Sequence, residues 1–175
     1  MLACKKWSDP KVPDDPRIHD RKYCNDPEAV NYNWNFPGDP DNSVCIYPSD
    51  LYKGTYSFTD SIYSDKNKFD SVGSLLPPYT LTIIALDKRH FRVVGFCATD
   101  SLKFTAERTT YRASADSTIM IQDTIKAYGQ FLCRTADTMT GYFTKFASDT
   151  SRLIIEFKVA SDTGINFHRG TAIRQ

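Results

Sequence analysis

The stretch Tyr52-Lys53-Gly54-Thr55-Tyr56-Ser57-Phe58-Thr59 decides the fold, because its aromatic and small residues alternate with polar ones. A strand places successive side chains on opposite faces, so this period of two predicts an antiparallel strand with one face in a core and the other in water. The same alternation recurs at 79–86, 91–97, 102–107, 118–122, 125–133, 141–146, 152–159 and 165–173. The sequence therefore predicts about eight or nine strands in succession.

Short polar joints separate several of these strands and have the lengths of hairpin turns, as in Asp87-Lys88-Arg89 and Ser161-Asp162-Thr163-Gly164. No window of about 11 residues shows a helical period, which disfavours a parallel α/β sheet. An antiparallel meander must protect its edges, either by closing into a barrel or by folding into two packed sheets. We predict an all-β fold closed into a barrel, with a two-sheet β-sandwich as the alternative. The long segment 60–78 is expected to be a lid over one mouth or a plain loop.

Composition limits the classes of partner. The chain has 175 residues and a mass of 19.9 kDa, which is enough for one domain with a substantial core. Its 22 Lys and Arg residues balance 21 Asp and Glu residues, and no basic cluster forms a stripe for phosphates, so nucleic acid is not an expected partner. No apolar run approaches the roughly 18 residues that span a bilayer.

The first four residues, Met1-Leu2-Ala3-Cys4, resemble the end of a bacterial lipobox, in which small residues precede a cysteine that is acylated. The resemblance implies that a lipid on Cys4 anchors the protein to a membrane. Because Lys5 rather than aspartate follows that cysteine, it also implies the outer membrane or cell surface. Three residues cannot supply a charged and an apolar leader region, so this expectation requires a leader upstream. Residues 1–22 are expected to be a polar tether.

The other four of the five cysteines fall into two pairs. Cys24 and Cys45 bracket a segment with little apolar periodicity, which would gain about 3 kcal/mol from covalent closure. We expect a disulfide there, with two free thiols as the alternative. Cys97 and Cys133 each continue the apolar face of a predicted strand and are expected to point inward. They fit a second disulfide and two inert core thiols equally well.

Two local matches point to known families. The run Cys24-Asn25-Asp26-Pro27-Glu28-Ala29-Val30-Asn31-Tyr32-Asn33, which closes at Cys45, resembles the C-x-D-P-x-A-x-N-Y-N…D-D-G-S-C module of exported and surface proteins of Bacteroidota. The resemblance implies an extracellular loop closed by a disulfide, here called the cap (23–48). The second half differs, because Asn42 replaces the glycine of the module and Val44 is an extra residue.

The triplet Gly54-Thr55-Tyr56 resembles the G-x-W signature of lipocalin-like (calycin-like) barrels, with tyrosine in place of tryptophan. This resemblance implies that residues 49–175 form such a barrel. It also implies that Tyr56 closes one end, and that a late basic residue, Arg169 or Arg174, packs across its ring.

Signatures of catalysis and of metal binding are missing from the sequence. His19, His90 and His168 are far apart, and none has zinc-type spacing with a cysteine or a second histidine. No nucleophile elbow, Walker loop or Rossmann fingerprint is present, so we expect no enzyme and no cofactor; a hydrolase with a dispersed active site is the less favoured alternative. Asp39 and Asp41 are a weak calcium candidate, because they lack the EF-hand pattern.

The function that these features favour is that of a non-enzymatic, surface-anchored lipoprotein acting as a binding or interaction module. The alternative is a lipocalin-type carrier of a small lipid or glycan. Tyr32, Trp34 and Tyr56 are candidate contacts for a ligand or a protein partner, although such aromatic residues more often plug one end of a barrel. The state of the interior separates the two readings. Bulky candidates for filling it are Tyr56, Phe58, Leu81, Phe91, Phe131, Leu153 and Phe157, whereas the small residues Gly54, Gly95, Ala106 and Gly129 leave space. A cavity below about 300 Å³ would count against small-molecule binding.

Overall fold

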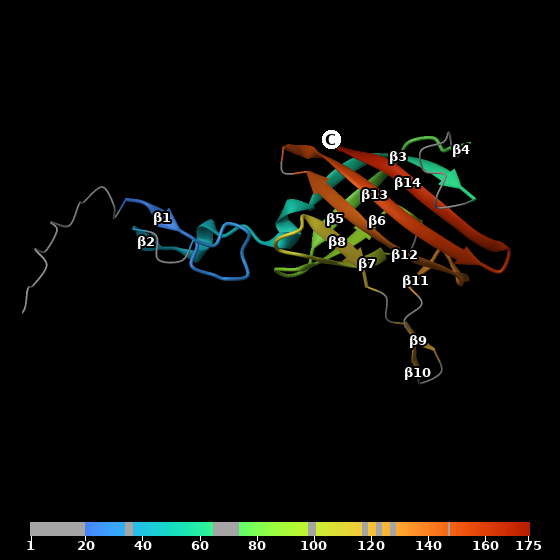
Figure 1. Cartoon of the computed structure of the whole chain (residues 1–175), viewed down its shortest axis with the longest axis horizontal. Coiled ribbons are helices and arrows are strands. Elements are labelled where there is room, and N and C mark those ends of the chain that lie inside the picture. Colours follow the sequence, from blue (N-terminus) through green and yellow to red (C-terminus); the bar gives the residue numbers. More distant parts are fainter. Residues whose placement is uncertain are drawn as a thin grey trace, which may run out of the picture.

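All but two of the elements in the structure, a computed structural model, are β-strands, and the two exceptions are short 3-10 helices (Figure 1). The described residues are 20–33, 37–64, 74–97, 101–116, 119–121, 124–126, 129–146 and 148–175. No helix in these ranges is long and apolar enough to cross a membrane. The predicted all-β fold class is confirmed, and the β-sandwich alternative is wrong, because the main sheet closes on itself.

Eight antiparallel strands form the closed barrel. The pairing of β12 with β8 joins the last strand of the order to the first, and it brings Tyr142 opposite Ser114. The barrel strands, in the order of the sheet, are β12 (Arg134–Phe146), β13 (Asp149–Ser161), β14 (Gly164–Arg174), β3 (Gly54–Tyr63), β5 (Tyr79–Ala85), β6 (His90–Val94), β7 (Ser101–Ala106) and β8 (Arg112–Ala115).

The barrel closes through a joint made of two separate strand segments. Both β8 and the short β11 (Gln130–Leu132) pair with β12, and the two strands between them in the sequence are not part of the barrel. These two strands, β9 (Ile119–Ile121) and β10 (Thr124–Lys126), form a hairpin that projects from the barrel in Figure 1. At the joint, the backbone N–H of Lys103 on β7 donates to Gln130 Oε1 at 2.6 Å, and Gln130 Nε2 donates to the Lys103 carbonyl at 2.5 Å. The carboxamide of Gln130 thus takes the place of a peptide group.

Three strand predictions were wrong in this region. The run 118–122 is not a barrel strand, and 125–133 is not continuous, because β10 pairs with β9 and only β11 joins the barrel. The strand β8 was not predicted, since its inward residues are two alanines, which give little apolar signal. Finally, β12 begins at Arg134, whereas the prediction began at residue 141. The first half of the strand was missed because it is rich in polar residues and shows no apolar alternation.

One end of the barrel is closed by packed side chains. The 3-10 helix η2 (Pro48–Leu51) leads into β3, and the fully buried ring of Tyr52 stacks on Phe91 with their centroids 5.1 Å apart. Side chains on the inner faces of the strands pack in this half and are fully buried: Tyr56, Phe58, Leu81, Phe91, Phe104, Phe143, Leu153 and Ile155. We call this half the closed end.

The ring of Tyr56 lies beneath a basic residue, as the lipocalin-like resemblance implies. The guanidinium of Arg174 lies 5.5 Å from the centroid of the Tyr56 ring, and its Nη2 donates to the Tyr56 hydroxyl at 3.1 Å. The Tyr56 hydroxyl in turn donates to the Tyr52 carbonyl at 2.8 Å. Arg169, the other residue considered, pairs instead with Glu156 at 3.0 Å.

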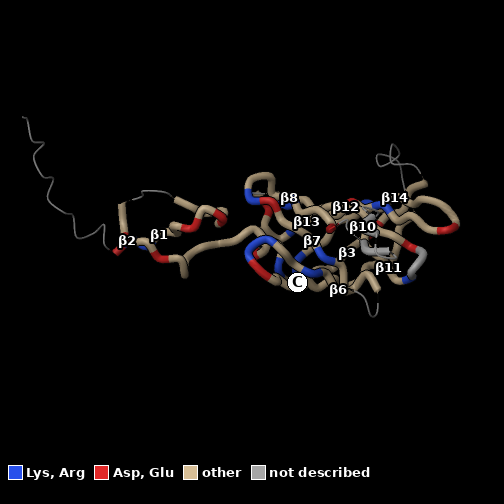
Figure 2. Tube along the Cα trace, turned by 90° about the horizontal axis from the view of Figure 1, so that it is seen from below, with Lys and Arg blue, Asp and Glu red and all other residues tan. Residues whose placement is uncertain are grey.

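The cap contacts the barrel at its closed end. Within it, β1 (Lys22–Tyr23) pairs in parallel with β2 (Asp39–Pro40), η1 (Asn42–Val44) follows, and the predicted disulfide joins Cys24 to Cys45. Lys88, in the β5–β6 turn, lies 2.7 Å from Asp26 and 2.8 Å from Glu28. Figure 2 shows the acidic segments of the cap and the mixed basic and acidic turns of the adjoining barrel end.

Candidate functional site

A cavity of about 410 Å³ occupies the end of the barrel opposite the cap. The strands β3 and β13 run toward this end and β14 begins there, so the cavity lies above the filled half. We call it the mouth cavity. Its lining residues come from β3, β5, β11, β13 and β14 and from the segments that follow β4 and β6: Asp60, Leu76, Tyr79, Gly95, Phe96, Leu132, Phe157 and His168.

Glycine keeps part of this space open. Gly95 has a φ of +119°, and a Cβ there would lie 2.2 Å from the carbonyl oxygen of Thr80, so no larger residue fits. Gly95 follows the inward residues Phe91 and Val93 of β6 and lines the cavity without a side chain. The barrel is therefore filled at the closed end and hollow at the mouth.

Aromatic rings form most of the wall of the mouth cavity. The ring centroids of Phe96 and Phe157 are 5.3 Å apart in an edge-on arrangement, and those of Tyr79 and Phe96 are 6.3 Å apart. The imidazole of His168 stacks on Phe157 with a centroid distance of 4.3 Å and an interplanar angle of 13°. These contacts hold the rings in fixed orientations around the cavity.

A buried carboxylate and a histidine lie side by side on this aromatic wall. Asp60 Oδ2 is 2.7 Å from His168 Nδ1, and the two side chains are 2% and 12% exposed. An ionised carboxylate only accepts hydrogen bonds, so the Nδ1–H of His168 is the donor. The other oxygen, Asp60 Oδ1, is buried and has no hydrogen-bond partner among the described residues. Burial, and to a smaller degree the Asp60 carboxylate, raise the pKa of Tyr79, whose phenol therefore stays neutral.

A histidine oriented by an aspartate is also the base of hydrolytic triads, which require a nucleophile beside it. None of the described residues that line the cavity is a serine, threonine or cysteine. The arrangement provides a buried negative charge, an oriented imidazole and apolar rings.

The second disulfide lies at the rim of the mouth. It joins Cys97 to Cys133, with their Cα atoms 5.4 Å apart, and so links the segments that carry Phe96 and Leu132. The expectation that both cysteines point into the core was wrong. Cys133 is exposed, with a φ of 59° between β11 and β12, and Cys97 lies beyond the end of β6 and is only half-buried.

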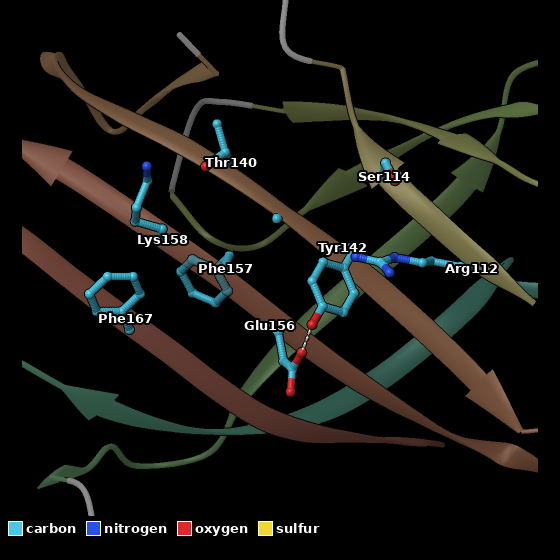
Figure 3. Close-up of a pocket in the computed structure, with 9 residues that line it drawn as sticks. Arg112, Ser114, Thr140, Tyr142, Glu156, Phe157, Lys158 and Phe167 are labelled. Carbon is cyan, nitrogen blue, oxygen red and sulfur yellow. Dashed lines mark hydrogen bonds between the residues drawn. The ribbon is translucent and has the colours of Figure 1, made fainter. Parts of the chain in front are cut away.

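A second recess of about 430 Å³ lies on the outer face of β8, β12, β13 and β14 (Figure 3). The ring of Tyr142 lies 3.5 Å from the guanidinium carbon of Arg112, and its hydroxyl donates to Glu156, which also pairs with Arg169. These polar groups satisfy one another. The mouth cavity, with its unpartnered carboxylate oxygen, is the stronger candidate for a ligand site.

The predicted site residues do not meet at the mouth. Tyr32 lies in the cap, with the Arg108 guanidinium 5.5 Å from its ring centroid, and Tyr56 is buried at the closed end. Cys4 and Trp34 lie outside the described residues.

The calcium candidate has other roles in the structure. Asp41 accepts a hydrogen bond from the Ser43 backbone N–H at the start of η1 and pairs with Lys22 at 2.8 Å, while Asp39 belongs to β2. The described residues include no group of three or more His, Cys, Asp or Glu residues that could hold a metal ion.

Sequence reasoning missed Asp60 and His168, although a signal for both was present. Asp60 continues the inward series of Tyr56 and Phe58. His168 lies on the inward face of β14, the same face as the buried Ala172. A charged or imidazole side chain in an inward register marks a buried polar site. Assigning residue 60 to a loop hid this signal.

The comparisons with known proteins found solved structures of low sequence identity. No family model matches the chain, and no curated protein matches it. Among solved structures, EF1p2_mFAP2b bound to DFHBI is 13% identical over 73% of this chain and 97% of that one, with a TM-score of 0.47. A redesigned β-barrel, mFAP1, bound to DFHBI is 15% identical over 73% and 98%, with a TM-score of 0.45. Zebrafish ileal bile acid-binding protein complexed with cholic acid is 8% identical over 71% and 99%, with a TM-score of 0.34.

Proposed function

We propose that this protein is a small-ligand binding module that holds a compact, largely apolar molecule in the mouth cavity. The observation that carries the proposal is a 410 Å³ cavity walled by oriented aromatic rings. Ligand sites of proteins typically measure about 300–1,000 Å³ and combine apolar walls with a few polar groups. The mouth cavity has both properties.

The rival reading, an interaction protein with a filled barrel, rested on bulky residues in the interior. Most of those residues pack in the filled half of the barrel, whereas Phe157 forms part of the wall of the mouth cavity. Phe131 is 41% exposed and does not contribute to the interior at all. The glycan alternative is less well supported than an apolar ligand, because the described lining offers one carboxylate, one imidazole and one phenol among otherwise apolar groups.

The proposal extends to the absence of catalysis and to anchoring. No side chain suited to be a triad nucleophile lines the described cavity, which supports binding over hydrolysis.

We further propose that a lipid on Cys4 anchors the module at the outer membrane or cell surface, on the basis of the lipobox-like residues Leu2-Ala3-Cys4. Intact mass of the protein expressed in a bacterial host with its native upstream codons tests this, and a mass without acyl groups would contradict it.

Binding in the mouth cavity is tested by filling it. Leu132→Trp places an indole among the lining residues, so we expect the affinity for the uncharged apolar probe N-phenyl-1-naphthylamine to fall at least tenfold. The measurement is a fluorescence titration of the full chain, in which the unmodified protein should show saturable binding at one site.

Ile173→Trp is the matched control. Ile173 is 56% exposed near the closed end, so the same indole there should leave the titration unchanged. Thermal unfolding checks that both variants are folded. Equal binding by the unmodified protein and a folded Leu132→Trp variant would contradict the proposed site.

A further inference from the structure

We infer that the ligand of the mouth cavity carries a positively charged amine on an apolar body, and that the Asp60 carboxylate binds this amine. The inference rests on the proposed function and gives the class of molecule that the site recognises. Three features of the cavity carry it: the partner-free oxygen of Asp60, the aromatic wall, and the set of charges along the lining.

The carboxylate of Asp60 is incompletely satisfied. Its side chain is 2% exposed, His168 binds one oxygen, and Oδ1 has no partner in the described part of the chain. Burying a carboxylate is costly unless opposite charge or hydrogen-bond donors compensate it, and buried polar atoms without a partner are rare in native proteins. A bound N–H donor would complete the hydrogen bonding of Asp60.

The rings beside Asp60 favour a cation over a neutral donor. Tyr79, Phe96 and Phe157 contact one another or His168 around the cavity. The faces of aromatic rings carry partial negative charge and attract ammonium groups, most strongly where water is excluded. An ammonium group would also neutralise the buried carboxylate, and such charge-assisted hydrogen bonds are stronger than those from a hydroxyl.

A metal ion fits the site less well than an amine. Calcium requires six to eight oxygen ligands, whereas the described lining supplies one carboxylate and one phenol, and His168 already uses its Nδ1 on Asp60. Among the described residues that line the cavity, none is a lysine or an arginine. A second charge on the ligand would therefore remain unpaired, and a ligand carboxylate would be repelled by Asp60.

The remaining lining is apolar and determines the chemistry of the part of the ligand that carries no charge. Leu76 and Leu132 line the cavity beside the aromatic rings, and Gly95 adds a stretch of wall without a side chain. The complementary molecule is an amine with an alkyl or aromatic body small enough for 410 Å³.

Three probes of one chain length separate charge from hydrophobicity: n-octylamine, n-octanol and n-octanoate, which are cationic, neutral and anionic at neutral pH. Titration calorimetry of the full chain is expected to give a Kd for octylamine at least tenfold lower than for octanol, with octanoate weakest. This comparison uses the unmodified protein and does not depend on any variant folding.

Asp60→Asn adds a second arm with the same side-chain shape. When the asparagine oxygen accepts the hydrogen bond from His168 Nδ1, the amide N–H₂ takes the place of Asp60 Oδ1. Octylamine should then no longer bind more tightly than octanol, and octanoate should gain affinity. Asp162→Asn removes the same charge from the exposed β13–β14 turn and should leave the order of the three probes unchanged.

An octylamine affinity equal to or below that of octanol would overturn the inference, as would an unchanged preference in a folded Asp60→Asn variant. The naphthylamine titration decides the proposed function separately. If that probe binds in a manner sensitive to Leu132→Trp while octylamine has no advantage, the binding function stands and the amine class is wrong.

Discussion

Arg174 ends β14 above Tyr56 and links three parts of the closed end. Its Nη2 donates to the Lys53 carbonyl at 2.5 Å and to the Tyr56 hydroxyl at 3.1 Å, and the same hydroxyl donates to the Tyr52 carbonyl. One side chain therefore connects the last strand to the chain that enters the first barrel strand. Its value to stability comes from hydrogen bonds made by a charged donor.

Removing the guanidinium of Arg174 is expected to loosen the closed end. Arg174→Met keeps the aliphatic stem and loses both hydrogen bonds, so the free energy of unfolding in urea should fall by about 1–2 kcal/mol. Arg92→Met, on the exposed outer face of β6, should change it by less than about 0.5 kcal/mol. Equal losses in the two variants would show that the contact over Tyr56 contributes nothing specific.

Lys145 is a buried lysine at the closed end, and it should make the free energy of unfolding depend on pH. It is 5% exposed and donates to the Leu51 carbonyl, and burial, followed by the nearby charge of Arg174, lowers the pKa of Lys145 to about 8. In the unfolded chain a lysine titrates near its ordinary value of about 10.4. Between these values the unfolded state holds more protons than the folded one, so this residue's contribution to stability rises with pH.

Comparison with Lys145→Met isolates this effect. The free energy of unfolding of the unmodified protein, relative to the variant, should increase by about 2 kcal/mol between pH 7.5 and 9.5. Below pH 7.5 the difference between the two proteins should be flat. A constant difference across the whole range would mean that the ammonium group is as well solvated in the folded protein as in the unfolded chain.

At the scale of elements, the disulfide Cys97–Cys133 ties the end of β6 to the start of β12. The cysteines are 36 residues apart, so Cys97→Ser with Cys133→Ser should lower the free energy of unfolding by about 4 kcal/mol in the loop-entropy model. Phe96 and Leu132 precede these cysteines and line the cavity, so naphthylamine affinity should fall as well.

The other disulfide provides the comparison. Cys24→Ser with Cys45→Ser opens the cap, which lies at the opposite end, and should destabilise the protein without changing probe affinity. Calorimetric unfolding and the same fluorescence titration distinguish the two pairs. Loss of affinity in both pairs would indicate a general loosening of the barrel rather than a local effect at the mouth.

At the scale of the whole molecule, the sequence predicted the strands in which apolar and polar residues alternate. Strands such as β3 and β13 show clear periods of two, and the barrel follows from the need to protect their edges. The strand β8 could not be recognised because its inward side chains are methyl groups, and the long first half of β12 is polar.

The mouth cavity could not be predicted because it depends on contacts between distant strands. Asp60 and His168 are 108 residues apart and meet only because β3 and β14 are neighbours in register. The pairing of Cys97 with Cys133 likewise requires the ends of β6 and β12 to lie at one rim. The spacing of these residues in the sequence predicts neither the contact of Asp60 with His168 nor the pairing of the two cysteines.

The joint at Gln130 has a consequence for how this barrel could vary. Because a side-chain amide completes the hydrogen bonding next to Lys103, the wall remains continuous although β9 and β10, which come between β8 and β11 in the sequence, lie outside it. The length of that excursion is uncoupled from the circumference of the barrel. A protein engineer could therefore insert a reporter peptide there, and a lineage could lengthen or shorten the segment, while the binding mouth keeps its shape.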